Sequence, residues 1–221
     1  FQRRFLLPGV IGCVDCTHVA IVKPKDNEHL YINRKGYHSL NVQMICDTNL
    51  RILSLNSKFG GSAHDSHIWS ASIMEGYMRG LHQHNENVWL LGDSGYPQRP
   101  WLMTPILNAA PGSREELYTS RHVQARNCIE RCFGLLKSRW RCLLKDRTLH
   151  YHPVVASKIV VACSVLHNMA LTATPLPLPL EFAADDVDDN TGEAPLENAD
   201  IDGQSELIQG RAMLHLLISR L

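Results

Sequence analysis

The chain has 221 residues, of which 44% are hydrophobic and 20% charged, fractions that are ordinary for a soluble globular protein. This length allows one domain with a sizeable core and a tail. The longest apolar run, residues 154–171, is interrupted by Lys158, His167 and Asn168, and a membrane-spanning helix needs roughly 20 apolar residues. We therefore expect no membrane partner. Because the sequence does not begin with Met, we expect it to be a fragment of a longer protein.

The net charge of zero conceals an asymmetry between two parts of the chain. Residues 1–180 hold 20 Lys and Arg against 12 Asp and Glu, a net of +8, whereas residues 181–206 hold ten acidic residues and no Lys or Arg. A basic body with an acidic tail is typical of a domain that binds a polyanion. Solvated charge on both segments explains the composition equally well.

The cysteines favour reduced, buried thiols. The chain has seven, at positions 13, 16, 46, 128, 132, 142 and 163, and most lie in apolar runs. This pattern is typical of a nuclear or cytosolic protein rather than of a disulfide framework. Cys13 and Cys16 have metal-like spacing, but residues three apart in a strand point to opposite faces, so we expect them to diverge. A zinc-stabilised scaffold is the weaker hypothesis.

Strands are expected early in the chain. Residues 9–15 form a short apolar run that ends in Asp15, which indicates a buried strand. The runs 40–46 and 51–59 flank a short Asp/Asn turn and predict a hairpin. After Gly60 and Gly61, a capping box of Ser62 and Asp65 predicts a helix. Its apolar stripe comprises Ile68, Trp69, Ser72, Ile73 and Tyr77.

The second half combines one more strand with helices. Residues 88–93 indicate a strand that ends in Asp93, and residues 94–118 a loop rich in Pro and Gly. A helix over 120–144 and a buried helix from Pro153 to 171 should follow. The apolar face of the first comprises Ile129, Phe133, Leu136, Trp140 and Leu143. This order predicts an α/β domain, a mixed sheet flanked by helices, over residues 1–172.

Residues 173–221 are expected to form a Pro-rich, acidic and largely disordered tail, because few large apolar side chains are available there to offset the entropy of ordering. Residues 207–221 have the pattern of a short amphipathic helix.

Three carboxylates are candidates for chemistry. Asp15 and Asp93 each end a strand, and Glu130 lies next to Ile129 at the edge of a buried helical stripe. Carboxylates that converge repel one another unless a cation lies between them. Hard oxygen ligands select Mg²⁺ or Mn²⁺, and two such ions can activate the attacking water and the leaving oxygen of a phosphodiester.

The helix that carries Glu130 is basic. Residues 121–147 hold eight Lys and Arg against two acidic residues, a net of +6. Arg126, Glu130, Lys137 and Arg141 fall at offsets 0, 4, 11 and 15, roughly one side of a helix. We therefore expect Arg126, Lys137 and Arg141 to contact the backbone of double-stranded DNA.

Several sequence blocks together resemble PIF/Harbinger-type DDE transposases and the nucleases derived from them. The blocks are Pro8-Gly-Val-Ile-Gly-Cys-Val-Asp-Cys-Thr-His-Val19, Asn33-Arg-Lys-Gly-Tyr-His-Ser-Leu-Asn41, Gly60-Gly-Ser-Ala-His-Asp-Ser66, Leu90-Leu-Gly-Asp-Ser-Gly-Tyr96, Arg126-Asn-Cys-Ile-Glu-Arg-Cys-Phe-Gly134 and Leu166-His-Asn168. They stand in the family's order and cover roughly residues 8–172. The family's helical DNA-binding region is not in this sequence, and the acidic tail resembles nothing in the family.

The resemblance implies a ribonuclease H-like fold with Asp15, Asp93 and Glu130 as the catalytic and metal-binding triad. It implies nuclease and strand-transfer activity on DNA with Mg²⁺ or Mn²⁺, two ions in number, and action in the nucleus, with some of the protein in the cytoplasm. A Myb-like DNA-binding partner protein is implied by the family alone, and a homo-oligomer is a further option. The alternative is a domesticated, catalytically silent module that binds DNA or protein on the same fold.

Four other residues have a functional and a bland interpretation. Asp65 is either a neighbour of the site or a helix cap, and we favour the cap. His64 and His18 are secondary site candidates, although a lone His in a loop more often lies on the surface. Of the four tryptophans, only Trp101, in the loop after Asp93, is a candidate for a DNA contact.

Overall fold

A five-stranded mixed sheet forms the centre of the protein. The computed structural model describes residues 1–173, 201–219 and 221. The strands are β1 (Val10–Ala20), β2 (Ser39–Cys46), β3 (Ile52–Gly60), β4 (Trp89–Leu91) and β5 (Leu102–Met103), in the spatial order β3-β2-β1-β4-β5. The first three are antiparallel neighbours, whereas β4 runs parallel to β1, and β5 to β4. The predicted hairpin is therefore confirmed as β2 and β3.

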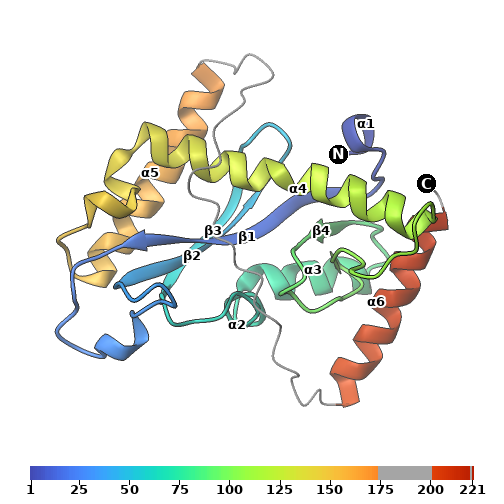
Figure 1. Ribbon diagram of the computed structural model, residues 1–221, viewed down its shortest axis with the longest axis horizontal. Helices are drawn as coiled ribbons and strands as arrows, with labels where there is room; N and C mark the ends of the chain where they lie inside the picture. The colour runs from blue at the N-terminus through green and yellow to red at the C-terminus, as the bar shows by residue number, and fades with distance from the viewer. Residues whose placement is uncertain (174–200, 220) are drawn as a thin grey trace.

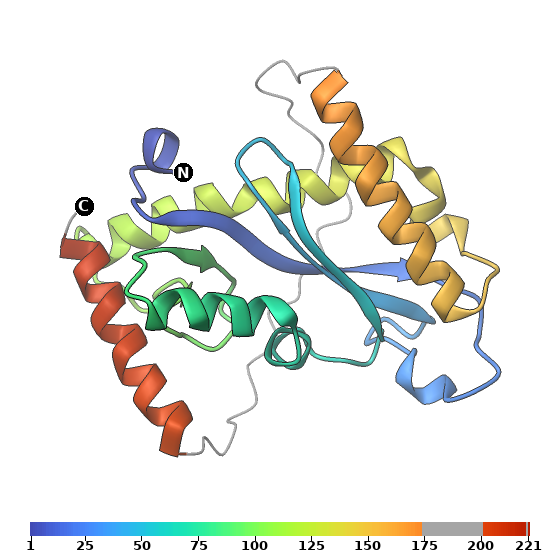
Figure 2. The ribbon, with the colours of Figure 1, turned by 180° about the vertical axis from the view of Figure 1, so that it is seen from behind.

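Helices cover both faces of the sheet (Figures 1 and 2). The helices are α1 (Gln2–Phe5), α2 (Asp65–Ser70), α3 (Ile73–Gln83), α4 (Arg114–Arg139), α5 (Pro153–Ala173) and α6 (Ile201–Ser219), with short 3-10 turns η1 (Glu28–Leu30), η2 (Arg141–Leu143) and η3 (Lys145–Arg147). α4 and α5 pack on one face in the larger apolar core, and α2 and α3 pack on the other around Trp69 and Trp101. The fold is a mixed α/β sheet flanked by helices, consistent with the predicted ribonuclease H-like class.

Several predicted boundaries were wrong. β1 does not end at Asp15 but continues to Ala20, because residues 13–20 stay paired with β2. The helix expected from Ser62 is two helices: Ser62 donates its hydroxyl to the Leu30 carbonyl, and Ser72 caps α3 by accepting from the Glu75 N–H. β5 was missed because two residues carry no periodic signal.

α5 is docked along one side only, whereas the sequence predicted a buried helix. The Asn168 side chain donates to the Ile52 carbonyl and accepts from its N–H, which fixes α5 to the start of β3. Val165 and Met169 lie on the side of the helix away from buried Val160, and both are exposed. Of the described helices, α5 is also the one long and apolar enough, by length and composition, to cross a membrane, which the interrupted sequence run did not suggest.

The predicted C-terminal helix is present as α6 and begins earlier than expected. Leu214, Leu217 and Ile218 are buried in the larger core, and Glu206 forms ion pairs with Arg79 and Arg99. This part of the expected tail therefore packs against the domain. Residues 174–200, with most of the acidic run, lie outside the described residues.

The docking of α6 depends on Gly210. A Cβ at Gly210 would lie 2.8 Å from the backbone carbonyl carbon of Arg99, whereas Gly76, in the middle of α3, has nothing within 4 Å. Backbone cannot yield as a flexible side chain can, so Gly210→Ala should weaken docking by about 1 kcal/mol or more despite the better helix propensity of Ala. Hydrogen exchange over residues 201–219 should become faster in Gly210→Ala and stay unchanged in Gly76→Ala. Equal exchange in both variants would contradict this packing.

Candidate active site

The site forms where one edge of β1 is left unpaired. β4 pairs with β1 only as far as Leu91 beside Cys13, and the next contact on this edge is a parallel bridge between Ile21 and Leu149. Asp15 lies two residues beyond Cys13, and Asp93 lies two residues beyond Leu91. Continuing the parallel register therefore places Asp15 and Asp93 side by side, with their side chains on the same face.

α4 brings the third carboxylate over this edge. Ile129 is fully buried against the sheet, which leaves Glu130 half-buried at the border of the core. One turn earlier, Arg126 donates from Nη2 to Asp15 Oδ2 at 2.6 Å and from Nη1 to Glu130 Oε1 at 3.1 Å. Asp93 also stabilises the charge on Arg126. The guanidinium therefore lies among all three predicted carboxylates.

The role expected for Arg126 differs from its placement. The sequence predicted a DNA contact, but in the structure both terminal nitrogens donate to carboxylates and the side chain is only 18% exposed. Helical spacing alone does not distinguish a cation that faces DNA from one that faces an acidic neighbour, because both lie on the side of Glu130.

The carboxylates are short of positive charge. Burial raises the pKa of Asp15 to about 7; the Arg126 guanidinium opposes this shift, while Asp93 and Asp65 add to it. Burial likewise raises the pKa of Asp93, which Arg126 and the Gly95 N–H oppose. One guanidinium therefore does not compensate the acidic group, and an added cation would be favoured.

The donor set fits a hard divalent cation. Asp15, Asp93 and Glu130 offer carboxylate oxygens, the ligands that Mg²⁺ and Mn²⁺ prefer. In the part of the chain that the structure describes, however, no three acidic, His or Cys side chains are already arranged to hold an ion. Asp15 and Glu130 both accept hydrogen bonds from Arg126, so the guanidinium supplies the positive charge beside them in this structure.

Asp65 belongs to the neighbourhood of the site. It is the first residue of α2 and accepts a hydrogen bond from Asn41 Nδ2 at 2.8 Å, so it contacts β2, and the helix has no side-chain cap. Its charge raises the pKa of both Asp15 and Asp93. The capping role that the sequence favoured for Asp65 was therefore wrong, because His64 is the N-cap of α2. A role for Asp65 at the site stays a prediction.

Asn41 is a site neighbour that the sequence did not single out. It is buried on β2, and its Oδ1 atom has no hydrogen-bond partner although Nδ2 binds Asp65 and the Ala63 carbonyl. An oxygen of this kind beside the Asp65 carboxylate is suited to a cation or an ordered water. The one feature of the sequence that could have pointed to Asn41 is that it places a polar amide within the buried strand of residues 39–46.

The hydrogen bonds described for the two secondary histidines go to residues other than the three predicted carboxylates. His18 is three residues after Asp15 on the same strand, so its side chain points to the opposite face, where Nδ1 lies 3.0 Å from Ser39 Oγ. His64 Nδ1 lies 2.7 Å from Arg34 Nη2 on the exposed side of α2. Neither imidazole contacts Asp15, Asp93 or Glu130 through any hydrogen bond described for these residues.

The predicted DNA contacts separate in space. Lys137 is seven residues after Glu130 on α4 and shares its side of the helix. Arg141 does not, because α4 ends at Arg139 and Trp140 leaves the helical conformation with φ −113 and ψ 79. Trp101 is 2% exposed with the Arg79 guanidinium 5.1 Å from its ring centre, so the proposed DNA contact by this side chain was wrong.

The cysteines are mostly core residues. Cys13 donates to the Ala125 carbonyl and Cys16 lies 3.6 Å from the Tyr96 hydroxyl, so the two thiols diverge as predicted. Cys46 and Cys128 lie 3.7 Å apart in the core beneath α4, which the sequence did not reveal. Among the described residues no four-ligand zinc arrangement exists, and this finding leaves the zinc scaffold without structural support.

Comparisons with known proteins identify the family. Residues 14–168 match the DDE superfamily endonuclease family. The chain is 41% identical over 167 residues to a Bos taurus protein named "Putative nuclease HARBI1", covering 75% of this chain and 47% of that protein, and 40% identical to the Homo sapiens protein of the same name over the same shares. It is 24% identical over 189 residues to the Arabidopsis thaliana "Protein ALP1-like", covering 77% and 45%.

These relatives are longer than the present sequence. The chain spans about half the length of the curated relatives that it matches. No solved structure matches. The family match covers well over half of the chain and includes the segments that carry the three carboxylates, so this chain belongs to the DDE superfamily endonuclease family.

Proposed function

We propose that this chain cleaves phosphodiester bonds in DNA with Asp15, Asp93 and Glu130 as its metal-binding carboxylates. The observation that carries the proposal is the gathering of these side chains, from β1, the end of β4 and α4, around a single guanidinium. Structural ion pairs of α4 with β1 would need only Asp15 and Arg126. The additional carboxylates and the raised pKa of Asp15 favour a site that accepts divalent cations.

The residues would divide the work by position. Asp15 and Asp93, held by the Cys16 and Gly95 N–H groups, would ligate the metal from the sheet, and Glu130 from the helix. When bound there, Mg²⁺ or Mn²⁺, expected as two ions, would lower the pKa of a water molecule and polarise the phosphodiester. Asn41 would orient Asp65 beside the triad.

The same centre would support strand transfer if a DNA 3′-hydroxyl group took the place of the attacking water. Action in the nucleus, a Myb-like partner protein and assembly into homo-oligomers stay predictions from the family resemblance.

A plasmid-nicking assay tests the proposal. Supercoiled plasmid should be converted to open circles by the wild-type chain with Mg²⁺ or Mn²⁺, and not with EDTA. Asp93→Asn should lower the nicking rate at least roughly 100-fold. Loss of a residue that only hydrogen-bonds to a metal ligand already costs about 10- to 100-fold, and loss of a ligand itself should cost more. The control Asp26→Asn makes the same substitution at an exposed aspartate, and it should nick at the wild-type rate.

Two results would count against the proposal. Nicking that persists in EDTA, or an Asp93→Asn variant as fast as Asp26→Asn, would place the activity elsewhere. A wild-type chain that binds plasmid without nicking it under any metal would instead support the silent binding module.

A further inference from the structure

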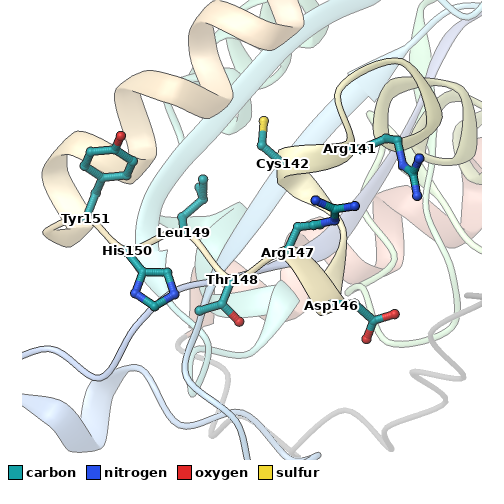
Figure 3. Close-up of a pocket in the computed structure, with 8 residues that line it drawn as sticks. All are labelled: Arg141, Cys142, Asp146, Arg147, Thr148, Leu149, His150 and Tyr151. Atoms are coloured by element: carbon teal, nitrogen blue, oxygen red, sulfur yellow. The ribbon is translucent and has the colours of Figure 1, made fainter.

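A basic cavity lies beyond the end of α4, away from the carboxylates. Its volume is about 690 Å³, and its lining comes from the segment 141–151 (Figure 3). Arg141, Arg147 and His150 line it together with one acidic side chain, Asp146. Two guanidinium groups against one carboxylate leave the lining positive. No ion pair within the described residues joins either arginine to an acid.

The segment that forms the cavity is fixed to the domain. Leu143 is 1% exposed in the core. Leu149 donates its N–H to the Ala20 carbonyl and accepts from the Val22 N–H, which adds it to the end of β1. Lys145 Nζ lies 5.1 Å from the centre of the Tyr37 ring. Because the segment is anchored at three points, the backbone that carries the two exposed arginines is fixed before any ligand arrives.

The cavity and the carboxylates share one edge of the sheet. Both lie on the edge of β1 that β4 leaves open, with Asp15 at one end of the open stretch and the Ile21–Leu149 bridge at the other. Ile21 lies six residue steps along the strand from Asp15, roughly 20 Å at about 3.3 Å per residue. That distance corresponds to about six base-pair steps along a duplex with one phosphate per 3.4 Å on each strand.

We propose that this cavity holds backbone phosphates of the DNA duplex whose bond is cleaved at Asp15, Asp93 and Glu130. The substrate class rests on the proposed function, whereas the recognition chemistry is that of the cavity itself. Guanidinium groups bind phosphate oxygens in bidentate geometry, and contacts to the backbone fix the register of a duplex without reading its sequence. Arg141 and Arg147 thereby place a bond several base pairs away over the carboxylates.

DNA binding measured without metal tests this inference independently of cleavage. A labelled duplex of about 25 base pairs is titrated in EDTA with the wild type, with Arg141→Ala/Arg147→Ala and with Arg3→Ala/Arg51→Ala. The control removes two exposed cations at the opposite end of β1 and so changes the net charge equally. The cavity variant should bind at least about tenfold more weakly and reduce the log–log salt slope by about two units, and the control by much less.

Cys142 gives a second readout that needs no substitution. It lines the cavity and is exposed, whereas the other six cysteines are buried. Alkylation of Cys142 by N-ethylmaleimide, followed by mass spectrometry, should slow at least about fivefold in saturating duplex, because bound backbone covers the lining. Inorganic phosphate at millimolar concentration should protect Cys142 less than duplex does, since a single phosphate ion covers less of the cavity than a continuous DNA backbone.

The outcomes are distinct. If duplex binds but leaves Cys142 equally reactive, or if both double variants lose affinity equally, the cavity is not a DNA contact. If phosphate alone protects as fully as duplex, the cavity binds a free anion and the duplex assignment is wrong. If Cys142 is protected but no metal supports cleavage, the cavity assignment stands and the proposed nuclease function fails.

Discussion

Arg126→Ala should lower the free energy of unfolding by about 3–5 kcal/mol at pH 8 without metal, because it leaves buried carboxylates without their counter-ion. Arg126 is the one cation described in hydrogen-bond contact with both Asp15 and Glu130, at 2.6 and 3.1 Å. The loss should shrink towards pH 6, since Asp15, whose pKa is already raised by burial, can then protonate. Urea unfolding at the two pH values measures the difference.

The metal makes the same experiment informative about function. Mg²⁺ or Mn²⁺ can supply the positive charge that Arg126 provided, so saturating metal should recover much of the stability lost in Arg126→Ala. Gln124→Ala, an exposed substitution on the same helix, should change stability by less than about 0.5 kcal/mol. An Arg126→Ala variant as stable as Gln124→Ala at pH 8 would mean that the guanidinium does not compensate the carboxylates.

Asp15→Asn should remove a dependence of stability on pH. The folded-state pKa of Asp15 is about 7, against about 3.8 as the ordinary value. Between these two values the unfolded chain has released the proton that the folded chain retains, so wild-type stability should fall as pH rises from about 4 to about 7. A shift of about three units sets an upper limit of about 4 kcal/mol on this loss.

The asparagine variant cannot ionise and should keep its stability over that range, ending more stable than the wild type at pH 8 without metal. Asp26→Asn, at an exposed position, should follow the wild-type curve. Thermal unfolding from pH 4 to pH 8 would show the difference, and parallel curves for Asp15→Asn and the wild type would place the ionisation of Asp15 outside this range.

The sequence predicted the sheet better than the ends of its elements. The apolar runs at residues 40–46 and 51–59 predicted the hairpin correctly, because the side chains of a buried strand form a continuous apolar run that is visible in the sequence. The sequence pattern did not predict that β1 extends past Asp15, because Thr17 and His18 are polar. Both nevertheless lie within the part of the strand that pairs with β2. Pairing with a neighbour, which is a tertiary interaction, decided that boundary.

The candidate site was predictable only in part for the same reason. Strand-end and stripe-edge positions pointed to Asp15, Asp93 and Glu130, and the structure brings them around one cation. Local spacing could not show that Arg126 faces Asp15, 111 residues away. Local spacing also could not show that α4 ends before Trp140, so that Arg141 lines a cavity away from the carboxylates.

Direct titration of the protein with Mn²⁺ in a calorimeter, without DNA, tests the metal site most directly. The wild type should bind Mn²⁺, Glu130→Gln should bind it at least about tenfold more weakly, and Glu86→Gln, an exposed control, should match the wild type. Binding that is absent from the wild type, or that survives unchanged in Glu130→Gln, would contradict a metal centre built from Asp15, Asp93 and Glu130.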